Sequence, residues 1–192
     1  MRCLSCHALS WGTFCRACRQ TLLQPSMTKR KVEELLVYSF FNYQHIEDLL
    51  LTKHTPQGYR VYSALGRYFF RPFMKSFLAE YSHKVYVLGI DEVIKGGYSH
   101  VACLTHAMKI SHSKVLHAKL LAQNPVKYAG QSLAYRLAHP RQFIYTGPSK
   151  ISVILVDDIV TTGSTLREAK HLLEDQGVEV LFALSLADAR MP

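Results

Sequence analysis

The chain has 192 residues, of which 48% are hydrophobic and 19% charged. This composition excludes an intrinsically disordered chain and suits one α/β domain with a small appendage. No apolar run approaches the roughly 18 residues that a membrane span needs, and no apolar segment follows Arg2 as in a secretory signal, so we expect a cytoplasmic protein.

The chain is strongly basic. Lys and Arg total 23 against 14 Asp and Glu, which gives a net charge of +9. This excess favours polyanionic partners, namely nucleic acid, anionic lipid or a phosphorylated small molecule. Charge alone does not choose among these three classes.

Four of the five cysteines lie near the N-terminus as two Cys-x-x-Cys pairs, Cys3 with Cys6 and Cys15 with Cys18. Two such pairs can offer four thiolates to one tetrahedral Zn²⁺. Disulfides would need an oxidising compartment, and a redox site would need one pair beside a βαβ unit. We therefore predict a structural zinc ribbon over residues 1–24, with metal binding supplying most of its folding free energy.

Cations and one aromatic residue accompany these cysteines. Arg2, Arg16 and Arg19 are of the type that holds phosphates, and Trp11 could stack on bases. Trp11 could equally pack over the zinc site, and packing is the role we expect.

A linker is expected at residues 24–26, Gln-Pro-Ser, so a second unit should cover residues 25–192. In its first half, aromatic and β-branched residues favour a strand over 35–43, and apolar spacing predicts helices over 46–52 and 61–78. In its second half we expect strands over 85–90, 115–117, 151–156 and 178–186, and helices over 98–108 and 166–173, with Gly177 as the stop of the last helix. This alternation predicts an α/β fold with a parallel sheet flanked by helices, whose ligands bind at the carboxyl ends of the strands.

The segment 153–165 carries the most specific pattern. A buried strand runs into Asp157 and Asp158, then into a loop of hydroxyl residues and glycine that opens a helix. Gly163 permits a tight turn and close backbone approach, and a helix N-terminus attracts phosphate. The carboxylates, placed at the end of the strand, can accept from ribose hydroxyls or hold Mg²⁺. The predicted ligand contacts are Asp157, Asp158, Thr161, Thr162, Gly163, Ser164 and Thr165.

This segment resembles the phosphoribosyl pyrophosphate (PRPP) signature of type I phosphoribosyltransferases. Together with the paired Cys-x-x-Cys module, the chain resembles the ComF family of competence proteins, which join a zinc finger to a phosphoribosyltransferase-type domain. The resemblance implies that Lys95 and Gly96 lie in the loop that holds pyrophosphate, and that residues 118–141 form a flexible loop with Lys127 and Arg136 as candidate cations.

Two functions follow as hypotheses. One is an Mg²⁺-dependent phosphoribosyltransferase with an unknown acceptor, in which Asp157 and Asp158 orient the ribose. The other is a PRPP-binding module that contacts single-stranded DNA. Since the resemblance implies a role in natural transformation, with DNA-import machinery at the inner membrane as a partner, we favour a PRPP-binding protein of DNA uptake. A nucleobase phosphoribosyltransferase of purine or pyrimidine salvage is the alternative.

Overall fold

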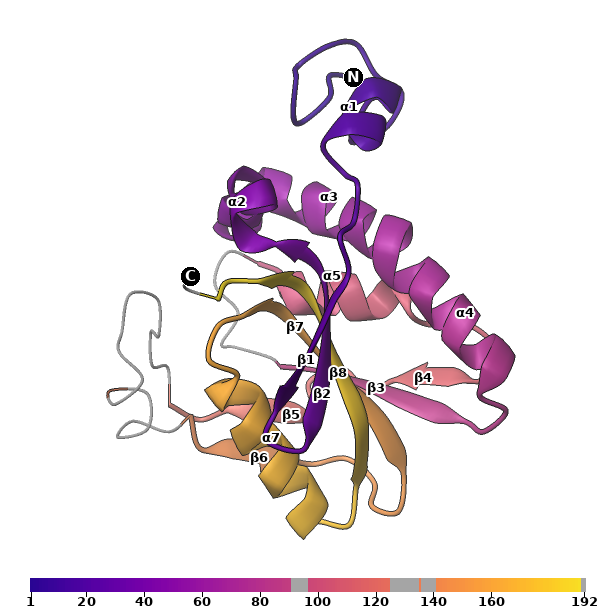
Figure 1. The fold of residues 1–192 in the computed structure, drawn as a ribbon, viewed down its shortest axis with the longest axis vertical. Coiled ribbons are helices and arrows are strands. Elements are labelled where there is room, and N and C mark those ends of the chain that lie inside the picture. The colour runs from indigo at the N-terminus through magenta and orange to yellow at the C-terminus, as the bar shows by residue number, and fades with distance from the viewer. Residues whose placement is uncertain (91–96, 125–134, 136–140, 191–192) are drawn as a thin grey trace.

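A six-stranded sheet forms the centre of the molecule (Figure 1), in a computed structural model that describes residues 1–90, 97–124, 135 and 141–190. The strands lie in the order β1-β2-β8-β7-β3-β4. Their bounds are β1 (Thr28–Val32), β2 (Leu35–Asn42), β3 (Val85–Gly89), β4 (Ser113–Val115), β7 (Ser152–Val160) and β8 (Glu179–Asp188). Neighbouring strands are parallel, except that β1 pairs antiparallel with β2. The predicted α/β class is confirmed.

The central strand β7 is buried on both faces, which explains its unbroken apolar run. Ile154 and Val156 pack in one hydrophobic cluster, whereas Val153 and Leu155 pack in a second cluster on the other side of the sheet. Alternate residues of a strand point to opposite faces, so a strand covered on both sides needs apolar residues at every position.

Helices cover the first face. These are α2 (Tyr43–Leu50), the 3₁₀ turn η1 (Leu51–His54), α3 (Pro56–Leu65), the π-helical turn η2 (Gly66–Phe70), α4 (Arg71–Glu80) and α5 (His100–Ala107). The segments α3, η2 and α4 follow one another as one helical rod (Figure 1). The helix predicted over 61–78 is confirmed but begins earlier, because the Thr55 side chain accepts from the Gly58 N–H and Pro56 occupies the first turn.

Gly66 lets this rod approach α5 closely. A Cβ at position 66 would lie 3.0 Å from the Ala107 Cβ and 3.1 Å from the Cys103 carbonyl oxygen. The rod and α5 therefore pack nearly backbone to backbone at this point, which holds α5 against the sheet.

The second face is covered by α7 (Ser164–Asp175) and by a two-stranded hairpin of β5 (Leu120–Ala122) and β6 (Phe143–Tyr145). The helix predicted over 166–173 is confirmed within α7, and Gly177 follows it with a φ of +72°. The sequence did not predict β5, β6 or β1, because each is short and becomes a strand only through pairing with a distant segment.

The N-terminal segment contains α1 (Arg16–Thr21) and lies beyond the helical layer (Figure 1). His45 Nε2 is 2.7 Å from the Leu22 carbonyl oxygen, and the Arg19 guanidinium lies over the Tyr68 ring at 5.6 Å. These contacts join the segment to α2 and η2. Across the described parts of the chain, no helix has both the length and the apolar character needed to cross a bilayer.

Two predicted boundaries were wrong. The strand expected at 115–117 lies at 113–115, where it pairs with β3. The acid pair was expected at the end of its strand, but β7 continues through Val160 because Ile159 and Val160 still pair with β8. The two acids consequently point to opposite faces of the sheet, as residues inside a strand do.

Candidate functional site

The loop between β7 and α7 depends on Gly163. This residue has a φ of +82° and is the N-cap of α7, with no side chain to cap the helix. A Cβ there would lie 2.6 Å from Val32 Cγ2 of β1. Glycine is thus required both by backbone conformation and by space. Gly163 offers no capping side chain, and the Ser164 N–H at the start of α7 donates to Thr162 Oγ1 at 3.3 Å.

A small, open hollow lies in front of this helix start, lined by Asp157, Ile159, Val160, Thr161, Gly163, Thr165 and Leu166. Of the residues predicted to contact the ligand, the hollow brings together Asp157, Thr161, Gly163 and Thr165. It does not include Thr162, which is exposed and donates its hydroxyl to Ser164 Oγ at 3.1 Å. The positive end of the α7 dipole and the loop hydroxyls suit the hollow to a phosphate group.

Arg30 of the edge strand β1 contacts the backbone of this loop. Its guanidinium donates to the Thr161 carbonyl oxygen, and its Nε lies 3.1 Å from Asp188 Oδ2. Arg190 Nε also donates to Asp188 Oδ2, at 3.0 Å. Sequence reasoning missed Arg30, because it lies far from the motif in the chain and its neighbours are other cations. Arg30 thus holds the loop backbone at Thr161 while its charge is balanced by Asp188.

Asp157 faces the hollow and is half-buried. Its Oδ1 accepts from the Asp158 N–H at 2.8 Å. Burial and the adjacent Asp158 charge raise the pKa of Asp157 well above its usual value, although Arg141 acts in the opposite direction. A ligand hydroxyl or a cation placed in the hollow would stabilise the ionised form of Asp157, which its surroundings disfavour.

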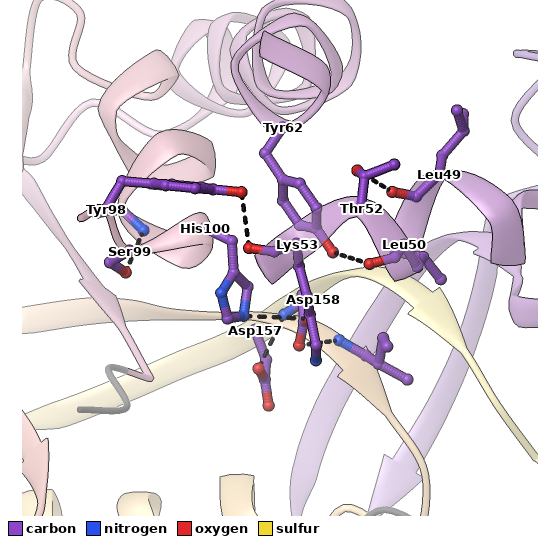
Figure 2. A network of polar contacts seen from close by, with 12 residues as sticks. Leu49, Leu50, Thr52, Lys53, Tyr62, Tyr98, Ser99, His100, Asp157 and Asp158 are labelled. Atoms are coloured by element: carbon purple, nitrogen blue, oxygen red, sulfur yellow. Dashed lines mark hydrogen bonds and ion pairs between the residues drawn. The ribbon is translucent and has the colours of Figure 1, made fainter. Parts of the chain in front are cut away.

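Asp158 lies on the other face, beneath the helices (Figure 2). Its Oδ2 is 3.0 Å from Lys53 Nζ and 3.2 Å from His100 Nε2, and its side chain is 8% exposed. Burial would raise the pKa of Asp158, but His100 and Lys53 hold it well below the usual range. The buried Tyr62 ring, whose hydroxyl donates to the Leu50 carbonyl oxygen at 3.2 Å, packs against the His100 ring.

Lys53 and His100 were not predicted as site residues. His100 falls in the segment that follows Lys95 and Gly96, where position alone could have suggested it, but Lys53 carries no sequence signal. Lys95, Gly96, Lys127 and Arg136 lie outside the described residues. Where the described chain resumes at Arg141, the Glu168 carboxylate on α7 accepts from the backbone N–H groups of Arg141 and Gln142 at 3.1 and 2.7 Å.

The four N-terminal cysteines form a second candidate site. The Sγ atoms of Cys3, Cys6, Cys15 and Cys18 all lie within 4.8 Å of one another. A tetrahedral Zn²⁺ with Zn–S bonds of about 2.3 Å separates its sulfurs by roughly 3.8 Å, so this donor set fits the metal. Cys3 Sγ also accepts from the backbone N–H groups of Ser5 and Cys15, and Cys15 Sγ from that of Cys18.

The thiols of this cluster differ in acidity. Burial opposes ionisation of Cys3, but hydrogen bonds from the backbone of Cys6, Cys15 and Ser5 lower its pKa to about 6. For Cys18, a hydrogen bond from Ser5 lowers the pKa, but the neighbouring Cys6 thiol and burial outweigh it and raise the pKa to about 12. Four adjacent thiolates repel one another, so a cation is needed for all four to ionise together.

Trp11 does not pack over the cysteines. Its side chain is fully exposed, and Leu9 beside it is 84% exposed. The expected packing role was wrong, because Thr13 and Phe14 rather than Trp11 occupy the interior of this small segment.

The chain is similar in sequence to known proteins. Residues 130–191 match the model of the phosphoribosyl transferase domain. The chain is also 29% identical over 128 residues to the competence protein ComFC of Streptococcus pneumoniae. That match covers 63% of this chain and 57% of the relative, so the chain spans little more than half of that protein's length.

Solved structures of phosphoribosyltransferases are also similar. The adenine phosphoribosyltransferase of Saccharomyces cerevisiae is 17% identical, with a TM-score of 0.42 over 88% of this chain and 89% of that one. The orotate phosphoribosyltransferase of Mycobacterium tuberculosis is 16% identical, with a TM-score of 0.42 over 90% of this chain and 82% of that one. The domain match, the ComFC match and the four-cysteine cluster confirm the predicted resemblance of this chain to the ComF family of competence proteins.

Proposed function

We propose that the chain is a PRPP-binding, phosphoribosyltransferase-like protein of the cytoplasm that acts in DNA uptake during natural transformation. The observation that carries PRPP binding is the hollow at the start of α7, where the Gly163 loop and Asp157 face the same space. The domain match and the ComFC relative support the class of protein. Residues 1–24 would form the zinc ribbon and residues 25–192 the phosphoribosyltransferase-like unit.

The ligand would lie along the loop with its 5-phosphate at the N-terminus of α7. Thr161, Thr162, Gly163, Ser164 and Thr165 would supply backbone N–H groups and hydroxyls. The acid pair would orient the ribose, and Lys95 and Gly96 would meet the pyrophosphate. Carboxylate and hydroxyl oxygens are ligands that Mg²⁺ accepts, so Asp157 could hold it. When bound, Mg²⁺ neutralises charge on the pyrophosphate leaving group.

The same arrangement would serve group transfer. A nucleophile would attack ribose C1, the bond from C1 to the pyrophosphate oxygen would break, and pyrophosphate would leave with the bonding electrons. The residues of this chain would hold the ribose in line for that attack. Incubation with labelled PRPP and candidate acceptors, including nucleobases and single-stranded DNA, would identify the product. A nucleoside monophosphate product would favour the salvage alternative.

Calorimetric titration with PRPP and Mg²⁺, and separately with inorganic phosphate, tests the site. Asp157→Ala should weaken PRPP by about tenfold or more, since ligand hydroxyls lose a charged acceptor, and should leave phosphate unchanged. Gly163→Val should weaken both ligands, because its side chain would meet Val32 and displace the loop. Gly177→Val is the matched control, since Gly177 has a similar φ but lies beyond the far end of α7. Absence of PRPP binding by the wild type would contradict the proposal.

Binding of single-stranded DNA is the second part of the proposal. The net charge of +9 supports it, as do the exposed Trp11 and Arg16 on the N-terminal segment. Bases can stack on an exposed indole, and phosphate contacts release counterions. Binding should therefore show little sequence preference and should weaken steeply as salt is added.

A salt titration of the DNA affinity measures this directly. Arg16→Gln should lower the slope of log affinity against log salt by about one, whereas Lys150→Gln, an exposed cation next to Ile151 at the start of β7, should leave it unchanged. No binding at low salt, or binding indifferent to salt, would count against a DNA-contacting role.

A further inference from the structure

Two side chains of β1 contact the loop between β7 and α7 outside the hollow. The Arg30 guanidinium donates to the Thr161 carbonyl oxygen, and the Val32 side chain fills the space that a Cβ at position 163 would need. Arg30 and Val32 are two positions apart, so they lie on one face of β1. Thr161 and Gly163 line the hollow, whereas these two side chains of β1 are not among the described residues that line it. The edge strand therefore contacts the outer side of the loop.

The turn between β1 and β2 lies beside α7 (Figure 1). Glu33, in this turn, accepts from Arg167 at 3.0 Å, and its other carboxylate oxygen lies 3.3 Å from His171 Nε2. Both partners belong to the first two turns of α7. Such exposed ion pairs are weak on their own. Together with the contact of Arg30, they place one hairpin against both the loop and the helix that follows it.

Arg30 is held on its other side by β8. Its Nε lies 3.1 Å from Asp188 Oδ2, at the end of that strand, and the two side chains are 15% and 6% exposed. Arg190 shares this carboxylate from a more exposed position. A guanidinium presents its N–H donors in a rigid plane, so contacts with the carboxylate and with the Thr161 carbonyl oxygen fix its orientation. Because Asp188 balances the charge of Arg30, we expect the effect of Arg30 on the loop to depend on geometry rather than on charge.

The contact with Arg30 fixes the direction of one peptide group in the loop. In a trans peptide the C=O and the following N–H lie in one plane and point in opposite directions. The Thr161 carbonyl oxygen faces Arg30, so the Thr162 N–H points away from β1. The Ser164 N–H, in contrast, donates to Thr162 Oγ1 within the loop. The orientation of the peptide between residues 161 and 162 thus decides whether the loop offers an anion a donor or an acceptor at this point.

We propose that Arg30 is a positioning residue of the phosphate site: it holds the peptide between Thr161 and Thr162 with its N–H toward the hollow and does not contact the ligand. This inference rests on the proposed binding of a phosphate group in front of α7. Without Arg30 the peptide can rotate, and the rotated form replaces an N–H, which binds anions, by a carbonyl oxygen, which repels them. The apparent affinity then falls in proportion to the fraction of molecules that keep the N–H toward the hollow.

The variants Arg30→Met, Arg30→Lys and Lys31→Met test this assignment. Calorimetric titration with inorganic phosphate, and separately with PRPP and Mg²⁺, is combined with the thermal unfolding midpoint of each variant. Arg30→Met should weaken both ligands by a similar factor of about tenfold, as when about one tenth of the molecules keep the productive peptide. Lys31→Met is the matched control, because Lys31 is an exposed cation on the other face of β1, and it should change neither affinity.

Arg30→Lys separates geometry from charge. A lysine can keep the ion pair with Asp188, so the unfolding midpoint should stay close to that of the wild type. Its single ammonium does not reproduce the rigid plane of donors that holds the Thr161 carbonyl oxygen, so phosphate affinity should fall as in Arg30→Met. Wild-type phosphate affinity in Arg30→Lys would show that charge alone matters, and would overturn the inference.

Backbone amide relaxation, measured by NMR at Thr162 and Gly163 without ligand, reports the motion of the peptide itself. Arg30→Lys should show more motion at these two amides than the wild type or Lys31→Met. Weakened phosphate binding with a Thr162 amide as rigid as in the wild type would show that Arg30 acts on the ligand directly, which contradicts a positioning role.

Failure of the proposed function looks different. If the wild type binds neither inorganic phosphate nor PRPP, the loop is not a phosphate site. The relaxation measurement needs no ligand, so it still decides whether Arg30 holds the peptide between Thr161 and Thr162.

Discussion

Gly163 is constrained by a residue 131 positions earlier in the chain. Its positive φ would by itself make any side chain unfavourable, by roughly 1–2 kcal/mol. The contact with Val32 adds a second constraint, because a methyl group at position 163 would meet two carbons of that side chain at under 3 Å. The loop that faces the hollow is thus held in place by the edge strand β1.

Gly163→Ala should therefore lower the free energy of unfolding by more than Gly177→Ala, by about 1–3 kcal/mol. Both residues have positive φ, but a Cβ at position 177 would have only Ser149 Cβ near it, at 3.9 Å. Chemical denaturation of the two variants measures the difference.

A double variant tests the contact between position 163 and the Val32 side chain. Adding Val32→Ala to Gly163→Ala should recover part of the excess loss, since the two closest carbons are removed. Equal losses for Gly163→Ala and Gly177→Ala would show that only the backbone conformation matters.

At the scale of elements, a hydroxyl pair joins two parallel strands inside the core. Ser39 Oγ of β2 lies 2.7 Å from Ser185 Oγ of β8, and both side chains are buried. Ser185 Oγ also donates to the Ala187 carbonyl oxygen at 3.3 Å. A hydroxyl has one hydrogen, so with Ser185 donating to Ala187 the hydrogen between the two serines comes from Ser39.

This pairing predicts an asymmetry between two alanine variants. Ser185→Ala should lower the free energy of unfolding by about 1–3 kcal/mol, because it leaves the buried Ser39 hydroxyl without that partner. Ser39→Ala should lower it less, since Ser185 keeps its contact with Ala187. The double variant should be nearly as stable as the wild type. Chemical denaturation of all four proteins checks this, and a double variant with the summed loss of the singles would be contrary to it.

At the scale of the whole molecule, few polar contacts among the described residues join the N-terminal segment to the helical layer. His45 meets the Leu22 carbonyl oxygen, and Arg19 lies over Tyr68. Few residues of the segment are buried, namely Cys3, Thr13, Phe14, Cys18 and Leu23. So small an interior cannot hold the segment folded by apolar burial alone, which leaves the cysteine cluster as its main source of stability.

The purified, reduced protein should hold one Zn²⁺, and Cys15→Ser should release it. We expect residues 1–24 to become sensitive to protease in that variant, while the thermal unfolding of the sheet is retained. Metal analysis and limited proteolysis measure the two effects. Cys103→Ser, on α5 and away from the cluster, is the control and should keep its zinc. Full zinc occupancy in Cys15→Ser would refute the site.

Particular elements and residues show which parts of the fold and of the site could be predicted from the sequence. Periodicity located β2, β3, β7, β8, α5 and α7, because these elements bury apolar residues at a regular spacing. It missed β1, whose residues Thr-Lys-Arg-Lys-Val alternate only weakly, and it placed β4 two residues late. The site was predicted where it is contiguous in the chain, at the loop after β7. Arg30 contacts the loop, and Lys53 and His100 contact Asp158, each from an element distant in the chain. No local sequence pattern marks Arg30 or Lys53.

By itself, the sequence determined the α/β class, the cysteine set and the loop that opens α7, because each depends on residues close together in the chain. The tertiary structure decided which way each acid of the pair points and what it meets. Asp157 and Asp158 are neighbours in sequence with the same chemistry, yet one lines the hollow and the other is buried against Lys53 and His100. The physical reason is that β7 does not end at the acids: pairing with β8 extends it, and an extended strand sends adjacent side chains to opposite faces.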